Sequence, residues 1–211
     1  MDRMKNGKVQ LFEMALAMGL VLTLLFCMGA ERSQKELADR LLRLHVIAPS
    51  DKAEDQALKL RVRDRVLETA AACLAEARDV ESAMVLLEEN LPELERVARE
   101  QVLSDGCDYS VTVSLTTDSF PTKVYDGFAL PPGDYEALRV VLGEGQGQNW
   151  WCVVFPPLCA AAASDELEKE ALRAGLTEEH LRLITQEDQT YVVKFKTLEI
   201  WEAVKRFFRG K

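Results

Sequence analysis

Histidine is scarce in this chain of 211 residues, which contains only His45 and His180. Nucleophilic catalysis needs a serine or cysteine beside a base, and zinc sites draw on clustered histidine and cysteine. Neither histidine has such neighbours at ligand spacing, and we expect one on a strand surface and the other in a solvated first helical turn. The sequence therefore predicts no catalytic residue, no metal site, no cofactor and no enzymatic activity.

Positive charge is also in short supply. The chain has 26 lysine and arginine residues against 35 aspartate and glutamate residues, which gives a net charge of −9. Proteins that bind nucleic acid usually present a basic face to the phosphates, so we expect no nucleic-acid partner. The acidic residues alternate with basic ones, a pattern that is typical of a solvated surface.

The N-terminus combines an apolar run with basic flanks. Residues 14–30 carry no charge, Arg3, Lys5 and Lys8 precede them, and Glu31 follows. This length is at the short end for a spanning helix and slightly long for the apolar part of a signal peptide. A buried core helix is the alternative. The basic flank orients the N-terminus inward and sends the rest of the chain across the membrane.

The chain therefore divides into three predicted regions. Residues 1–30 form a signal peptide or membrane anchor, with residues 11–30 as the apolar helix, and residues 31–40 form a charged stalk. Residues 41–211 form an extracytoplasmic domain that is large enough for its own core. Whether the N-terminal helix is cleaved stays open at this point.

Hydrophobic periodicity predicts a mixed order of helices and strands in the domain. Strands are expected at 42–48, 109–115, 120–125, 135–142, 150–155 and 191–195, and helices at 51–77, from 79, from 90 to 104, from 164 to 175, from 177 and at 201–208. A capping box at Asp51 and Glu54 and N-caps at Asn90, Ser164 and Thr177 mark four helix starts. This order indicates an α+β fold in which helices pack on one mostly antiparallel sheet.

The most unusual stretch is GEGQGQNWWCVVFPPLC at 143–159. Its glycines superficially resemble a phosphate-binding loop, but an apolar strand follows where such a loop needs a helix that begins with lysine and serine or threonine. A carboxylate pair of Glu144 and Asp134 has no fixed separation, so a glycosidase site is not supported. We expect residues 143–147 to form a hairpin loop and residues 150–155 a central strand covered on both faces.

The two adjacent tryptophans favour a binding surface. Neighbouring strand residues face opposite ways, so one ring is expected to pack inward and the other to lie nearer the surface. Exposed tryptophans often dominate protein interfaces, although core positions for both rings are the alternative. The candidate partner-binding residues are Glu144, Gln146, Gln148, Asn149, Trp150 and Trp151.

Four cysteines lie outside the apolar N-terminal segment: Cys73, Cys107, Cys152 and Cys159. An even number in an extracytoplasmic domain permits disulfides, and Cys152 with Cys159 is the local candidate. The alternative is that these cysteines are small buried apolar residues, which we prefer for Cys73.

Several long motifs resemble the stage II sporulation protein R family of endospore-forming Firmicutes. They are LRLHVIA at 42–48, SDKAEDQALKLRVRD at 50–64, FPTKVYDG at 120–127, PPGDYEALRVVLGEG from 131, and the stretch at 143–159. Pro49 and Gln148 depart from the pattern, because we expect asparagine and histidine at these positions. If that histidine has a chemical role in the family, this chain cannot reproduce it.

The resemblance implies a secreted or membrane-tethered signal without enzymatic activity. Such a protein is exported into the space between the forespore and mother-cell membranes. There it activates a membrane-embedded aspartic protease, which processes the precursor of the mother-cell sigma factor, pro-sigma-E. Two alternatives stay open: an extracytoplasmic hydrolase of the cell wall in the septal space, and a membrane-tethered structural protein. A hydrolase predicts a concave pocket with convergent polar groups, whereas a signal predicts a flatter patch.

Overall fold

The computed structural model describes residues 14, 16–19, 21, 29, 32–161 and 167–185. Most of the predicted N-terminal helix, the cap at Ser164, the strand at 191–195 and the helix at 201–208 lie outside these residues. Within the described residues, no helix is long and apolar enough to cross a membrane. The chain divides into two units, Met1–Glu36 and Leu37–Lys211, and the second contains the folded domain.

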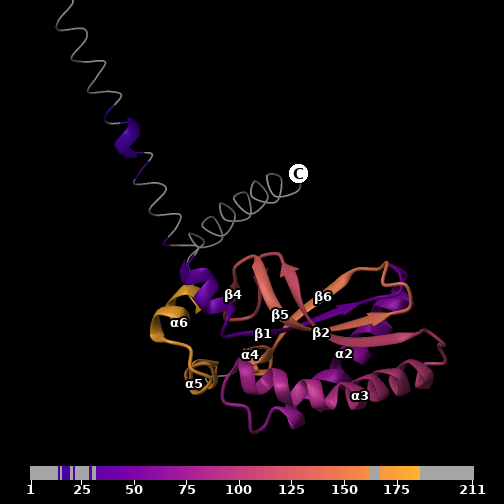
Figure 1. The fold of residues 1–211 in the computed structure, drawn as a ribbon. Helices are drawn as coiled ribbons and strands as arrows, with labels where there is room; N and C mark the ends of the chain where they lie inside the picture. The colour runs from indigo at the N-terminus through magenta and orange to yellow at the C-terminus, as the bar shows by residue number, and fades with distance from the viewer. Residues whose placement is uncertain are drawn as a thin grey trace, which may run out of the picture. The chain divides into compact units, whose positions relative to one another are not determined.

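A four-stranded sheet forms the centre of the domain (Figure 1). Its strands are β1 (Leu42–Ile47), β2 (Val111–Phe120), β5 (Gly133–Leu142) and β6 (Asn149–Phe155), in the order β2-β5-β1-β6. β1 runs parallel to β5, whereas β1 pairs with β6 and β2 pairs with β5 antiparallel. The prediction of an α+β fold with a mostly antiparallel sheet is confirmed.

β1 is an interior strand that is buried on both faces. Leu42, Leu44 and Val46 join the core beneath the long helices, and Arg43 and His45 are buried on the opposite face. The alternation of apolar and polar residues along this strand predicts mixed exposure, and that prediction is wrong. Polar residues at alternate positions look exposed in the sequence, but here other layers cover both sides of the strand.

Two long helices, α2 (Ala53–Cys73) and α3 (Val80–Ser104), pack against the first of these faces. α3 is one helix with Pro92 inside it, so the prediction of a separate helix starting at Asn90 is wrong. The Asn90 amide donates to the Leu86 carbonyl at 2.7 Å instead of capping a new helix. Leu87 and Leu94 lie two turns apart and are both fully buried, so one continuous helix keeps both in the core.

The predicted capping box at the start of α2 is also wrong. Lys52 occupies the N-cap position, and no side chain caps the helix. The Asp51 carboxylate accepts a hydrogen bond from the distant Gln148 backbone N–H at 2.8 Å. Asp51 therefore connects the start of α2 to the 143–149 segment.

The N-terminus of α3 does have a capping box. Asp79 accepts from the Ser82 N–H at 2.8 Å, and Ser82 Oγ accepts from the Asp79 N–H at 3.2 Å. Ser82 Oγ also donates to the Asp79 carboxylate at 2.7 Å, and this bond, followed by the one from the Ser82 N–H, lowers the pKa of Asp79. The charged carboxylate is therefore the capping form.

Replacing Asp79 by alanine is expected to lower the melting temperature by roughly 2–4 °C at neutral pH, the usual scale for the loss of one cap. The folded pKa is depressed, so the stabilisation is complete above the unfolded pKa of about 4 and fades as the pH falls through the folded value. Melting curves of the wild type, D79A and the capping control D79N between neutral and acid pH test this. A D79A deficit that does not change with pH would contradict it.

The other face of the sheet is covered by shorter elements. These are the β3 (Lys123–Val124) and β4 (Ala129–Leu130) pair, α4 (Leu158–Ala161), α5 (Leu167–Arg173) and α6 (Glu178–Thr185). The strand patterns at 109–115 and 120–125 predict a hairpin of these two segments, and that prediction is wrong. β2 runs on to Phe120 and pairs with β5 along its whole length. Thr177 caps α6 as predicted, because its hydroxyl accepts from the His180 N–H at 3.2 Å.

Leu37 and Leu41 belong to the core of this second layer and are fully buried in it. Part of the region predicted to be a stalk therefore contributes to the hydrophobic core. The folded unit begins at Leu37.

Candidate functional site

The 143–149 segment connects two strands that do not pair with each other. β5 and β6 lie on either side of β1, so the segment crosses the end of β1, and β6 is at the edge of the sheet formed by the strands that the structure describes. The predicted hairpin loop and the predicted central strand are both wrong. The sequence shows the glycine turn and the apolar run, but it does not show that a strand from the start of the domain lies between them.

Backbone hydrogen bonds hold this turn in place. The N–H groups of Gly143, Gly145 and Gly147 donate to the carbonyls of Ser110, Leu142 and Ala48, at 2.8, 3.1 and 2.9 Å. Gly145 has a φ of +62°, a conformation that favours glycine. At Gly147, a Cβ would lie 2.3 Å from the Ser50 carbonyl oxygen, so the close approach of two backbone segments requires glycine.

Side chains of the β1–α2 region fix the end of the turn. The Gln148 carbonyl accepts from Lys59 Nζ at 2.9 Å, and its N–H donates to Asp51 at 2.8 Å. Lys59 is buried and also donates to Gln56 Oε1 at 2.6 Å. Burial lowers the pKa of Lys59, although Asp51 opposes the shift. The turn is thus held by contacts on both sides.

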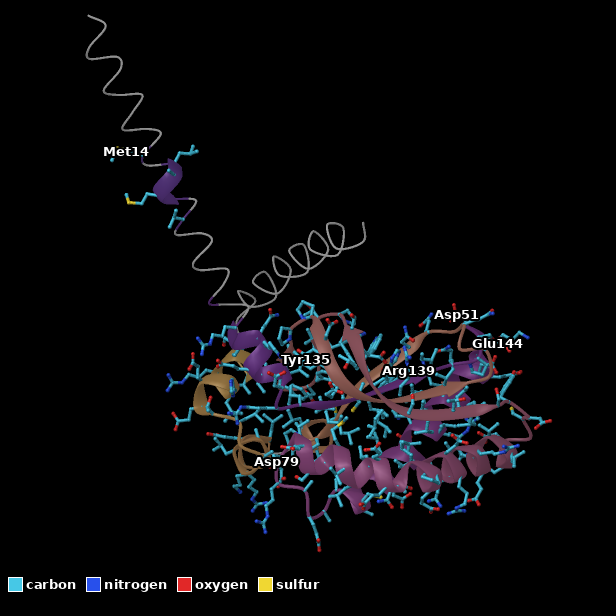
Figure 2. The ribbon with its side chains drawn as sticks, in the orientation of Figure 1. Met14, Asp51, Asp79, Tyr135, Arg139 and Glu144 are labelled. Atoms are coloured by element: carbon cyan, nitrogen blue, oxygen red, sulfur yellow. The ribbon has the colours of Figure 1, made fainter. Side chains whose placement is uncertain are left out.

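The candidate residues of the turn are accessible to solvent. Glu144, Gln146, Gln148 and Asn149 are all exposed, and Figure 2 shows Glu144 at the same end of the sheet as Asp51. A hollow of about 490 Å³ lies beside the turn and is lined by Pro49, Ser50, Lys52, Asp55, Asp108, Tyr109, Ser110, Gly143, Glu144 and Gln146.

Polar groups in this hollow bind one another. Ser50 Oγ donates to Asp55 at 2.5 Å, and a hydrogen bond with Asp55 raises the pKa of Tyr109. The partner of the Ser50 hydroxyl is thus a carboxylate, whereas the common serine nucleophiles are bonded to a histidine base. Among the described residues, no three side chains of ligating type lie close enough together to hold a metal ion.

The two tryptophans face opposite sides of β6. Trp151 packs inward, with its ring stacked 3.9 Å from His45 and 4.6 Å from Phe120. Trp150 is 37% exposed, and the Arg63 guanidinium lies 4.3 Å from the centre of its ring. Trp150 therefore continues the exposed surface of the turn, and Trp151 anchors that surface to the core.

A buried polar network that no sequence pattern indicates is joined to this surface through the Asn149 side chain. His45 Nδ1 lies 2.7 Å from Asp118 Oδ2, and His45 Nε2 lies 2.9 Å from Asn149 Oδ1. Asp118 also pairs with Arg139 at 3.0 Å. His45 is only 5% exposed, so its expected place on a strand surface is wrong. His180, expected to be solvated, is buried too.

Cys152 and Cys159 are free thiols, as are Cys73 and Cys107. The Cys159 sulfur accepts from the Val153 N–H at 3.2 Å. The two candidate cysteines lie close enough for their side chains to share a hydrogen bond. Their pairing as a disulfide stays a prediction.

Comparison with known proteins identifies the family. The family model of stage II sporulation protein R matches residues 38–165. The chain belongs to the stage II sporulation protein R family. It is 36% identical over 151 residues to stage II sporulation protein R of Bacillus subtilis (strain 168), a match that covers 67% of each chain. No solved structure matches the chain.

Membership of this family gives the protein a role in sporulation. The match to the family model covers the four-stranded sheet, both long helices and the 143–149 turn of this chain. The exposed turn and its buried support therefore lie within the part of the chain that defines the family.

Proposed function

We propose that this protein is an extracytoplasmic signal of endospore formation that activates a membrane-embedded aspartic protease. Residues 1–30 would export it, as a cleaved signal peptide or as an anchor, into the space between the forespore and mother-cell membranes. The activated protease would then process pro-sigma-E. Family membership supports this proposal, together with an acidic surface that disfavours nucleic acid.

The observation that carries the proposal is the exposed, firmly held surface formed by Glu144, Gln146, Gln148, Asn149 and Trp150. A ligand changes the activity of its target only through different affinities for the inactive and active states. A surface that is already ordered loses less entropy on binding than a mobile loop does. Trp150 offers the large aromatic contact that often dominates such interfaces.

Replacing Trp150 by alanine is expected to reduce processing of the precursor at least tenfold, because hot-spot tryptophans contribute about 2 kcal/mol or more. The E144A/Q146A/Q148A variant is also expected to reduce processing of the precursor. The measurement is processing by the protease reconstituted in vesicles with its precursor substrate and added full-length protein.

The matched control is L103A, because Leu103 is a similarly exposed apolar residue on α3 (54% exposed). Melting temperatures close to the wild-type value would show that each variant remains folded. Full activity of W150A would refute the placement of the contact surface. Processing that does not depend on the added protein would refute the proposed function itself.

The second candidate is a cell-wall hydrolase, which the polar hollow of about 490 Å³ beside the turn favours. A binding surface does not need such a concave pocket. Release of soluble fragments from purified peptidoglycan by the wild-type protein, but not by the hollow variants D55N and E144Q, would support it. No release by the wild type would exclude it.

A further inference from the structure

The outer edge of β6 is closed by side chains of its own domain. The Trp151 carbonyl accepts from the Tyr125 hydroxyl at 3.3 Å, and the Val153 N–H donates to the Cys159 sulfur at 3.2 Å. Exposed strand edges invite pairing with other chains, and native proteins often cover them. The Cys159 sulfur therefore accepts the hydrogen bond that a further strand would accept from Val153. Cys152 is the residue before Val153 in β6.

A buried cation contacts the backbone of the same segment of β6. Arg43 is fully buried, and its guanidinium carbon lies 4.0 Å from the centre of the Phe120 ring. Its Nη2 donates to the Tyr125 hydroxyl at 2.5 Å, and its Nε donates to the Cys152 carbonyl at 3.5 Å. Among the described residues, Nη1 has no hydrogen-bond partner, and no ion pair involves this side chain. A buried unpaired charge is unfavourable, so the site favours a negative charge nearby.

The thiol pair is arranged to supply that negative charge. A hydrogen bond from Cys159 lowers the pKa of the Cys152 thiol, and Arg63 and Arg43 add to this shift. The same interaction raises the pKa of Cys159, because a second thiolate beside the first is opposed. By contrast, burial and Glu93 raise the pKa of Cys73. Because thiolates and not thiols are nucleophiles, we expect Cys152 to be the attacking thiol of the pair and Cys159 the resolving one.

Reagents can reach the pair through an open pocket. A cavity of about 280 Å³ between α2 and β6 is lined by both sulfur-bearing residues and by Arg63, Asp64, Leu67, Ala71, Trp150, Val153, Val154 and Pro157. Most of its surface is apolar. Cys152 is buried within the fold, but it lies at a wall of this cavity.

We propose that Cys152 and Cys159 form a redox-active dithiol that a disulfide compound oxidises to an intramolecular disulfide. The Cys152 thiolate attacks one sulfur of the external disulfide, and the other sulfur leaves as a thiolate that takes up a proton. Cys159 then loses its proton and displaces the first sulfur from Cys152. Two cysteine thiols are thereby oxidised, and one external disulfide is reduced to two thiols.

The bond would attach the start of α4 covalently to β6. The Cys159 sulfur would stay near the Val153 N–H, so the sheet edge would remain closed. The segment enclosed by the bond contains Pro156 and Pro157, which follow the end of β6 directly. This inference does not depend on the proposed signalling function.

The test uses the full-length protein, reduced and then equilibrated in buffers of reduced and oxidised glutathione. After quenching, alkylation and trypsin digestion, both cysteines fall in one peptide, residues 140–169, because no lysine or arginine lies between Arg139 and Lys169. We expect this peptide to lose two hydrogen atoms and to resist alkylation under conditions that leave Cys73 and Cys107 reduced. Complete alkylation of Cys152 and Cys159 under those conditions would overturn the proposal, and so would a bond from either one to Cys107.

Two sets of variants test the chemistry. In C159S, glutathione should accumulate on Cys152, because the resolving thiol is missing; a chain that collects none would contradict the step. R63Q should slow oxidation several-fold at neutral pH. R65Q is the matched control, because Arg65 lies on the same helix and pairs with Glu68 in solvent. Equal rates for R63Q, R65Q and the wild type would contradict the role of the neighbouring cation.

Discussion

Replacement of Asp118 by alanine is expected to lower the free energy of unfolding by about 3 kcal/mol, the upper end of the cost of leaving a buried polar group without its partner. Asp118 is buried and is bonded to two side chains at once, His45 at 2.7 Å and Arg139 at 3.0 Å. Removing the carboxylate leaves the buried His45 without its partner, whereas the Arg139 side chain is 39% exposed and can still bind water. An uncompensated buried polar group costs far more than the original contact contributes.

Urea unfolding of the full-length wild type and D118A measures this difference. The matched control is D134A, because Asp134 lies on the neighbouring strand and bonds to Ser119, but is exposed. We expect a change of less than about 1 kcal/mol in the control, as for most exposed hydrogen bonds. Equal effects in both variants would show that the buried network does not stabilise the fold.

Replacement of Gly147 by alanine is expected to cost about 3 kcal/mol of stability, at the upper end of the range for overpacked sites. The added Cβ would lie 2.3 Å from the Ser50 carbonyl oxygen and 2.9 Å from the Ala48 side chain. A backbone oxygen cannot rotate away as a flexible side chain can. The turn must therefore move away from the β1–α2 connection, and the hydrogen bond from Gly147 to Ala48 would break.

The control is G106A, because Gly106 has a φ of +73° but open space around its Cβ position. Conformational strain alone costs about 1 kcal/mol there. If the proposed contact surface is correct, G147A should also lose protease activation at temperatures where it remains folded. A G147A protein as stable as the wild type would contradict the packing described at this turn.

Short sequence patterns correctly predicted some helix caps and strands. The cap at Thr177 follows from a short sequence pattern and is confirmed, and the strand predicted at 135–142 is confirmed within β5. Pro92 was misleading, because proline usually marks a first helical turn. Leu87 and Leu94, buried on either side of it, keep α3 continuous. Tertiary packing thus overrode a local signal.

The support of the candidate site could not be predicted in the same way. Asp118 stands in an alternating strand, where a polar residue normally faces solvent. Its partner His45 is 73 positions away, and nothing in either segment marks the pair. The burial of Arg43 could not be predicted either, because an arginine is rarely buried without a carboxylate partner. Such contacts follow from the strand order, which the sequence pattern leaves undetermined.

The central position of β1 has a consequence for how the protein folds. Leu42 pairs with Glu136 on one side and with Phe155 on the other, so β1 pairs with two strands that come more than 90 residues later in the sequence. This is a high contact order, and chains dominated by such distant pairings fold slowly. During synthesis, β1 would be complete long before either partner exists. Its apolar residues would stay unpaired until β6 is made, so this strand would need protection from aggregation while the chain is still incomplete.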